Sequence, residues 1–197
     1  MCTVLLIRHA DHPLIGRALA GRDDGIHLSD TGREQALALA QSLSHAPIAC
    51  IQSSPRLRCI ETAEALAEAF DLPVLIESAL DEIDFGKWNG ANFESLNRDP
   101  AWQVWNTDRA CARTPGGESM AEAQARIVDH LEAVQQRYAG QTVAMITHAE
   151  IIRAAWLHYT GRPLDEWQDV QIAPTSVTRL DLVRIPAPEI VLEAAAS

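Results

Sequence analysis

Two short apolar runs in this chain end in the same way, and this repetition limits the folds that it can adopt. Val4–Ile7 is followed, after one residue, by His9, and Val143–Ile146 is followed, after one residue, by His148. Continuous apolar runs of this length are typical of strands that are covered on both faces of a parallel sheet. The carboxyl ends of parallel strands line one crevice, where ligands bind. We therefore expect the two histidines to face each other across that crevice.

The rest of the chain alternates strand and helix patterns. Strands are predicted over the apolar runs Thr3–Ile7, Ile48–Ile51, Val74–Ile76 and Thr142–Ile146. Ser176–Val183 alternates apolar and polar residues, which is typical of an edge strand with one face in water. Apolar stripes at helical spacing lie within 36–43, 59–70, 120–134 and 149–158. This order predicts a three-layer α/β sandwich, with a mainly parallel central sheet and helices on both faces, built by residues 1–197 as a single domain.

Polar residues indicate where three of these helices begin. Thr31 with Glu34 has the spacing of a capping box before the first helix, and Ser119–Glu122 has it before the third. Ser54-Pro55 predicts an N-cap followed by proline at the first position of the second helix.

The segment from Gly86 to Gly117 breaks the alternation. Trp88, Trp102 and Trp105 lie there among polar residues, glycine and proline. We expect this segment to form a helical excursion over the active site.

The predicted crevice also collects positive charge. The second strand leads through Ser53–Pro55 into a helix, whose first N–H groups and partial positive charge point at the crevice. Arg56 and Arg58 lie in or near its first turn, and Arg8 precedes His9. Because arginine matches phosphate oxygens bidentately, two histidines, two or three arginines and a helix N-terminus suit a phosphate dianion. Either histidine alone would more often be structural, so the prediction depends on their combination.

Charge and composition exclude several partners. The formal net charge of −11 makes the chain a poor partner for nucleic acid or for an anionic membrane. No apolar run approaches the roughly 20 residues of a membrane span, and the run after Met1 is too short for a signal peptide. The four cysteines form no CxxC pair and fit a reducing cytosol. We expect a cytoplasmic protein, and the oligomeric state stays open.

His9 and His12 are close enough in sequence to suggest a metal site. They lie in a loop, and no matching pair of cysteines or histidines accompanies them. We therefore expect neither a metal nor a cofactor.

The chain also resembles a known family, on a series of motifs that occur in the family's order. Leu6–His9 is similar to its RHG signature, and the other matches are Leu28-Ser29-x-x-Gly32-x-x-Gln35-Ala36, Ser53-Ser54-Pro55-x-x-Arg58-x-x-x-Thr62-Ala63, Leu80-x-Glu82-x-x-Phe85-Gly86-x-Trp88-x-Gly90, Pro115–Ser119 and Thr147-His148. Together they resemble the histidine phosphatase superfamily, also called phosphoglycerate mutase-like. The resemblance spans positions 4 to about 153, and the whole series is far more specific than RHG alone.

The resemblance implies roles for individual residues. His9 would attack phosphorus and form a phosphohistidine. Arg8, Arg58 and His148 would bind the phosphate oxygens, with Arg58 rather than Arg56 as the family's second arginine. Glu82 would protonate the leaving group and then deprotonate the attacking water. Arg22, in a stretch similar to the family's Gly-Arg-x-Asp, is a further predicted substrate-binding residue.

The chain departs from the family pattern at four places. Ala10 and Ala149 stand where glycine is usual, and Asn89 stands where glutamate is frequent. The loop after His9 lacks the asparagine that many members use to contact phosphate. These departures leave the five catalytic groups in place and affect the choice of substrate more than catalysis.

Three functions are weighed on this basis. The favoured one is hydrolysis of a small phosphorylated metabolite, a phosphate monoester. A phosphoglycerate mutase-type transfer is the first alternative, although mutases of the family tend to be longer than this compact chain. A phosphate-binding module without turnover is the second, and the retained His9, Glu82 and His148 argue against it. Sugar phosphates, an α-ribazole-type nucleotide and phosphohistidine in a protein all remain open as substrates.

Overall fold

A single twisted sheet forms the centre of the computed structural model, which describes residues 1–182 and 190–193. Its six strands lie in the order β3-β2-β4-β1-β5-β6. From one edge to the other their bounds are Val74–Ile76, Ile48–Ser53, Thr142–Thr147, Cys2–Arg8, Val177–Leu182 and Ile190–Glu193. The first four strands run parallel, and β5 and β6 are each antiparallel to their neighbour. The mainly parallel sheet of the prediction is confirmed.

The pairing of β1 with β4 brings the two histidines together. Ile7 lies opposite Ile146 and Arg8 opposite Thr147. His9 continues the pairing by donating its backbone N–H to the carbonyl oxygen of Thr147 at 3.0 Å. His148 directly follows Thr147. The two histidines, which lie at equal distances after their apolar runs in the sequence, are therefore neighbours in space.

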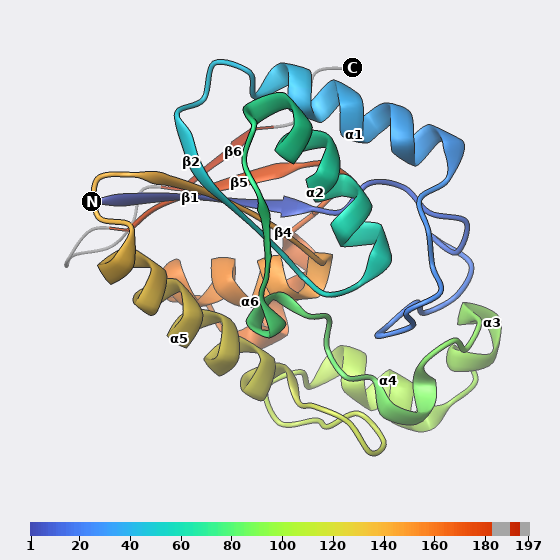
Figure 1. Cartoon of the computed structure of the whole chain (residues 1–197). Helices are drawn as coiled ribbons and strands as arrows, with labels where there is room; N and C mark the ends of the chain where they lie inside the picture. Colours follow the sequence, from blue (N-terminus) through green and yellow to red (C-terminus); the bar gives the residue numbers. More distant parts are fainter. Residues whose placement is uncertain (183–189, 194–197) are drawn as a thin grey trace.

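Helices cover both faces of the sheet, as Figure 1 shows. α1 (Asp30–Ser42) and α2 (Leu57–Phe70) lie on one face, and α5 (Met120–Arg137) and α6 (Ala149–Tyr159) lie on the other. Alternate residues of each strand pack in two different hydrophobic cores, one on each face of the sheet, because successive side chains of a strand point to opposite faces. Leu5 and Ile7 pack in the core under α1 and α2, whereas Val4 and Leu6 pack in the core under α5 and α6. The three-layer architecture is therefore confirmed.

The predicted excursion is helical and lies beyond the carboxyl ends of the parallel strands (Figure 1). It contains the 3-10 helix η2 (Gly86–Trp88) and the α-helices α3 (Phe93–Leu96) and α4 (Pro100–Thr107). Its aromatic residues pack edge to face, with the rings of Trp88 and Trp102 5.2 Å apart and those of Phe85 and Trp105 6.3 Å apart. These aromatic residues, with Phe85 just before the excursion, are continuous with the core under α5 and α6. A further 3-10 helix, η3 (Leu164–Asp169), follows α6.

Two helix starts differ from the prediction. The N-cap of α1 is Ser29, whose Oγ accepts from the N–H of Gly32 at 2.9 Å, so Thr31 lies inside the helix. α2 begins at Leu57 and not at Pro55, and its N-cap residue is Arg56. The hydroxyl of Ser54 pairs with His148 Nε2 and also accepts from the N–H of Arg56 at 3.4 Å. The capping box of Ser119 before α5 is confirmed.

The last predicted strand was placed wrongly in the sheet. β5 is not an edge strand, since β6 pairs with it on its outer side over Val177–Leu180. The alternation of apolar and polar residues within one strand does not show whether a later segment of the chain pairs with it. The sequence pattern therefore could not reveal β6 as a neighbour. The predicted end of this strand at Val183 lies outside the described residues.

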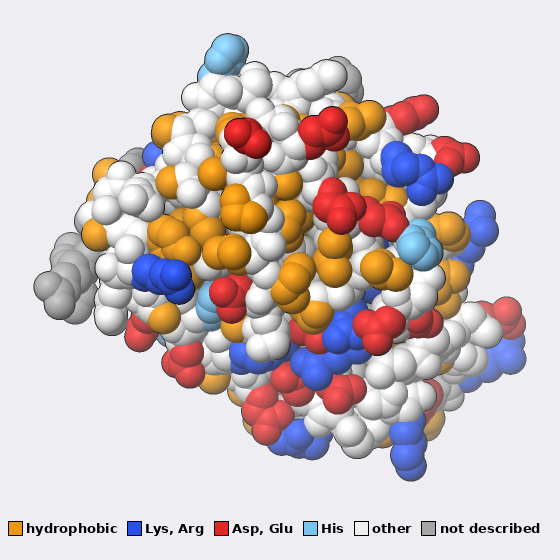
Figure 2. All heavy atoms as spheres, viewed as in Figure 1, with side chains coloured by type: hydrophobic (Ala, Val, Ile, Leu, Met, Phe, Trp, Pro, Cys, Tyr) orange, Lys and Arg blue, Asp and Glu red, His pale blue; other side chains and the backbone are white. Residues whose placement is uncertain are grey.

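The surface agrees with an acidic chain. Figure 2 shows aspartate and glutamate side chains spread over the visible face, with arginine and lysine side chains among them. None of the helices in residues 1–182 has both the length and the apolar character that crossing a membrane requires.

Candidate active site

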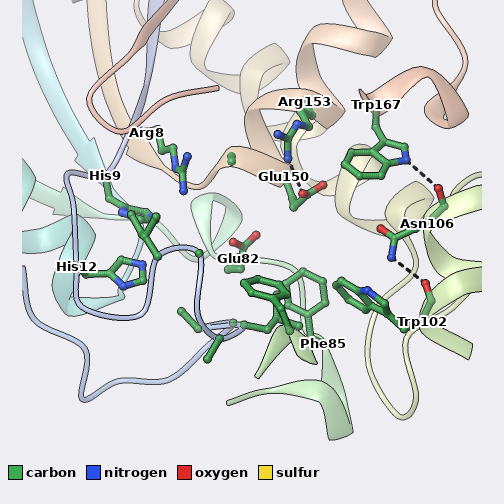
Figure 3. Close-up of a pocket in the computed structure, with 18 of the residues that line it drawn as sticks. Arg8, His9, His12, Glu82, Phe85, Trp102, Asn106, Glu150, Arg153 and Trp167 are labelled. Atoms are coloured by element: carbon green, nitrogen blue, oxygen red, sulfur yellow. Dashed lines mark hydrogen bonds and ion pairs between the residues drawn. The ribbon is translucent and has the colours of Figure 1, made fainter. Parts of the chain in front are cut away.

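The strand ends open into a cavity of about 280 Å³ (Figure 3). The end of β1 and the following loop supply Arg8, His9 and His12 to its wall, and Glu82 lies near its centre. The excursion, the first turns of α6 and η3 supply the remaining wall. The cavity therefore lies at the edge of the sheet where the sequence predicted the crevice.

His9 is held as a neutral base with one free nitrogen. Its Nδ1 lies 2.8 Å from the carbonyl oxygen of Ala10. A carbonyl can only accept, so Nδ1 carries the proton and the lone pair is on Nε2. Burial, and then the charges of Arg58 and Arg8, hold the pKa of His9 well below its usual range. An unprotonated Nε2 is the form of imidazole that can attack an electrophile.

The loop after His9 is fastened to both helices of its face. The N–H of Ala10 donates to Thr62 Oγ1 in α2 at 3.0 Å, and the N–H of Asp11 donates to Gln35 Oε1 in α1 at 2.9 Å. A Cβ at Gly32 would lie only 2.0 Å from the carbonyl oxygen of Asp11, so the approach of α1 requires glycine there. The φ of Ala10 is not positive, so the backbone there does not require the glycine that is usual in the resembled signature.

His148 and Arg58 lie together behind the cavity wall, and both side chains are buried. The ring of His148 lies 5.3 Å from that of His9, centroid to centroid. Arg58 Nη2 donates to His148 Nδ1 at 3.1 Å, which leaves the proton on Nε2, 2.8 Å from Ser54 Oγ. Burial, and then Arg58 and His9, hold the pKa of His148 well below its usual range. The two predicted phosphate ligands therefore adjoin His9, and their contact with phosphate stays a prediction.

Arg8 reaches the cavity directly. Its Nη1 donates to the carbonyl oxygen of Ile172 at 2.6 Å, and its buried Nε has no hydrogen-bond partner among the described residues. A guanidinium held at one end with donors to spare is suited to an oxyanion.

Glu82 has the protonation behaviour of a general acid. Burial, and then the nearby carboxylate of Glu150, raises the pKa of Glu82 to about 7, although the charge of Arg58 opposes this. Its Oε1 accepts from the N–H of Ile83 at 2.9 Å. Its Oε2 lies 3.8 Å from His148 Nδ1. A carboxyl group with this pKa can give and take a proton near neutral pH.

The loop that carries Glu82 is held by contacts to two other parts of the chain and by one contact within itself. Thr147 Oγ1, at the end of β4, donates to the carbonyl oxygen of Leu80 at 2.6 Å. Arg22 Nε donates to the carbonyl oxygen of Glu82 at 2.8 Å, and the N–H of Glu82 donates to Asp81 Oδ1 at 2.8 Å. The acid is therefore positioned by groups from the strand ends and from the loop after β1.

Arg22, a predicted substrate ligand, is not part of the cavity wall. Its Nη2 donates to Glu118 Oε2 at 2.9 Å, in addition to the contact with Glu82. These contacts make it a support of the acid loop, and a contact with substrate stays a prediction. Arg56 is likewise engaged, by two hydrogen bonds of 2.8 and 2.7 Å to the carboxylate of Asp81.

Several wall residues were not singled out as ligands by the sequence. His12, considered only as part of a metal pair, is buried with its ring 5.1 Å from that of His9. Arg109, Glu150, Arg153 and Trp167 form the far part of the wall. The sequence carried a signal near Glu150 alone, since the preceding residue, Ala149, is one of the departures from the resembled family pattern. Among the described residues, no three metal-binding side chains come together.

Comparison with known proteins gives a consistent result. Residues 4–185 match the histidine phosphatase superfamily (branch 1). The chain is 34% identical to phosphoserine phosphatase 1 of Hydrogenobacter thermophilus over 175 residues, which is 85% of this chain and 80% of that protein.

Two solved structures extend the comparison to the fold. A mycobacterial glucosyl-3-phosphoglycerate phosphatase aligns with a TM-score of 0.79 and 28% identity, over 90% of this chain and 89% of the other. The YhfR protein of Bacillus stearothermophilus aligns with a TM-score of 0.91 over 100% of this chain and 98% of the other; at 24% identity this shows the shared fold.

Proposed function

Because this chain belongs to the histidine phosphatase superfamily, we propose that it hydrolyses phosphate monoesters of small metabolites through a phosphohistidine on His9. The observation that carries the proposal is the state of His9: a neutral imidazole whose Nδ1 proton is bound to the carbonyl oxygen of Ala10. Its Nε2 lone pair is therefore open, in the same cavity as a glutamic acid whose pKa is about 7. The named relatives, which act on phosphoserine and on glucosyl-3-phosphoglycerate, are phosphatases for small esters.

In the first step Nε2 of His9 attacks phosphorus, and the bond from phosphorus to the ester oxygen breaks. Arg8 and Arg58 are proposed to neutralise the charge on the non-bridging oxygens, and neutral His148 to donate a further hydrogen bond to them, which supplies the electrostatic stabilisation that phosphoryl transfer needs. Protonated Glu82 gives its proton to the leaving oxygen, so the product departs as an alcohol.

In the second step a water molecule attacks the phosphohistidine. Glu82, now a carboxylate, takes a proton from this water, and the bond between phosphorus and Nε2 breaks. Inorganic phosphate leaves, His9 returns to its neutral form and Glu82 is again protonated. The direct test is phosphate release from a panel of small esters. Transfer of phosphate to a second metabolite without release would indicate the mutase alternative, and binding without turnover would indicate the binding module.

His12 is proposed to replace the asparagine that the loop lacks. Its Nδ1 accepts from the N–H of Leu14 at 3.3 Å, so its proton is on Nε2. Burial, and then Arg58 and Arg8, lowers the pKa of His12 to about 4, which keeps the ring neutral at pH 7. A neutral Nε2–H in the cavity wall is a donor for a phosphate oxygen.

His12→Ala is therefore expected to lower kcat/KM by about 10- to 100-fold, the equivalent of one hydrogen bond to a charged group. His12→Gln keeps an amide donor and is expected to lose less. Steady-state phosphate release at pH 7 measures both, and His45→Ala, at an exposed position, serves as the control. A His12→Ala rate within twofold of the wild-type rate would remove this role.

The proposed chemistry takes its positive charge from arginines, so activity is expected to be independent of metal. Assays with excess chelator should give the same rate of phosphate release as assays without it. A large loss that added divalent metal restores would contradict the mechanism.

We further propose one domain over residues 1–197 and a cytoplasmic location. Two observations support them: both cores pack on the same sheet, and all four cysteines are free thiols. Limited proteolysis tests the first, since cleavage into two stable fragments would contradict it. Cell fractionation tests the second.

A further inference from the structure

The cavity extends well beyond the groups that the proposed chemistry uses. Past Glu82 its wall is built by Arg109, which follows α4, by Glu150 and Arg153 of α6, and by Trp167 of η3. Figure 3 shows Glu150, Arg153 and Trp167 on the side of Glu82 that is opposite to His9 and His12. We call these four residues the distal subsite.

One carboxylate in the distal subsite binds two guanidinium groups. Glu150 Oε2 pairs with Arg109 Nη1, and Glu150 Oε1 pairs with Arg153 Nη1 at 2.6 Å. Burial alone would raise the pKa of Glu150, but Arg109 and Arg153 outweigh it and lower the pKa, so the group is charged at pH 7. Two positive charges on one negative charge leave the subsite with one excess positive charge.

The two arginines are held in place by groups other than Glu150. The guanidinium of Arg109, whose side chain is 3% exposed, lies 3.8 Å from the ring centroid of Trp167, and its Nη2 donates to Asn106 Oδ1 at 3.0 Å. Its buried Nε has no partner among the described residues. Arg153 Nε donates to the carbonyl oxygen of Val170 at 2.9 Å. Such packing keeps the donors oriented before any ligand arrives.

Arg153 has a donor to spare toward the cavity. Its Nε and Nη1 are engaged, whereas its Nη2 makes no hydrogen bond to any residue in the described part of the chain. Its side chain is 13% exposed, and the cavity is what it borders. A largely buried guanidinium with an unpaired N–H, in a site with excess positive charge, is stabilised by a bound anion that supplies both an acceptor and a negative charge.

We propose that the distal subsite binds a carboxylate of the substrate, so that the substrates are phosphate esters of small carboxylic acids. This inference rests on the proposed function, in which Arg8 and His9 receive the phosphate of the same molecule. One excess charge matches a monoanionic carboxylate, whereas a second phosphate dianion would bring two. An ammonium group would add a third positive charge beside Arg109 and Arg153, whose pairing with Glu150 already leaves one positive charge in excess.

Matched esters test the inference. 3-Phosphoglycerate and glycerol 3-phosphate differ by a carboxylate in place of a hydroxymethyl group, and O-phosphoserine and phosphoethanolamine differ by a carboxylate in place of hydrogen. We expect the wild-type enzyme to prefer the carboxylate ester of at least one pair by about 10- to 100-fold in kcat/KM, the equivalent of one charge-assisted hydrogen bond. In Arg153→Met this ratio should fall to near 1. In Arg98→Met, which removes an exposed arginine paired with Glu94, the ratio should not change.

Equal kcat/KM values within both pairs for the wild-type enzyme would overturn the inference, and this comparison needs no variant to fold. A ratio that survives in Arg153→Met would also overturn it. p-Nitrophenyl phosphate separates this failure from that of the proposed function. If the enzyme hydrolyses p-nitrophenyl phosphate but shows no preference within the two ester pairs, only the proposed subsite is wrong. If it hydrolyses none of these esters, both the subsite and the proposed function are overturned.

Discussion

His9→Ala is expected to abolish phosphate release, with a fall in kcat on the order of 10⁴-fold or more. The reason is that the substitution removes Nε2, the atom that forms the bond to phosphorus, and no other unprotonated nitrogen takes its place. His148 adjoins His9, but its Nε2 proton is directed at Ser54 Oγ and its Nδ1 accepts from Arg58. The fold should persist, since among the described residues the His9 side chain makes a hydrogen bond only to its neighbour Ala10.

Trapping of the intermediate measures this directly. Wild-type enzyme mixed with a ³²P-labelled ester and quenched in base should retain label on a histidine. His9→Ala should retain none, and His45→Ala should retain as much as the wild type. Circular dichroism and thermal unfolding check that the variant is folded. Label that remains on His9→Ala would reject His9 as the nucleophile.

The second large effect is expected for Glu82→Gln, and its size should depend on the leaving group. An alkoxide is a strong base that needs a proton as the ester bond breaks, whereas p-nitrophenolate needs one far less. Glutamine keeps the shape of the side chain but cannot donate as an acid, and general acid catalysis contributes roughly 10²–10⁴-fold. The variant should lose about that factor on an alkyl phosphate and much less on p-nitrophenyl phosphate.

Single-turnover measurements are needed for this comparison, because slow hydrolysis of the phosphohistidine would lower both steady-state rates alike. Glu34→Gln is a suitable control, since Glu34 is an exposed carboxylate of α1 that is outside the cavity wall. Equal single-turnover losses of Glu82→Gln on the two esters would reject Glu82 as the acid.

The pKa of Glu82 adds a pH dependence to the same experiment. The protonated form is the donor, and burial followed by Glu150 raises its pKa to about 7. Phosphorylation of His9 by an alkyl phosphate should therefore be independent of this group below pH 7 and fall tenfold per pH unit above it. This fall should be absent for p-nitrophenyl phosphate and for Glu82→Gln. Ionisation of the substrate phosphate is common to both esters and cancels in their ratio.

The sequence by itself determined the layers of the fold and the position of the central site. Apolar runs reveal strands that are buried on both faces, and parallel strands direct their carboxyl ends to one edge of the sheet. Two histidines at equal offsets after such runs then lie at the same edge, and the pairing of β1 with β4 makes His9 and His148 neighbours. Glu82 could be identified only through the family's motif. In a loop, no periodic pattern distinguishes a catalytic glutamate from one that is simply exposed to solvent.

Only the tertiary structure decided how polar side chains outside the strands are used. Ser54 has the sequence signature of a helix cap, but the end of β4 brings His148 within hydrogen-bond distance of its hydroxyl. Arg22 has the signature of a ligand, but the acid loop and Glu118 engage its guanidinium.

The distal subsite depends on tertiary structure most of all. Arg109 and Trp167 are far apart in the chain, and their contact forms because the excursion and η3 fold over the same end of the sheet. Local spacing determines which face of a helix or strand is buried, because that choice depends on neighbours within a few residues. The partner of a long charged side chain depends on which distant segment arrives beside it. That is why the chemistry could be predicted from the sequence, whereas the distal wall of the cavity could not.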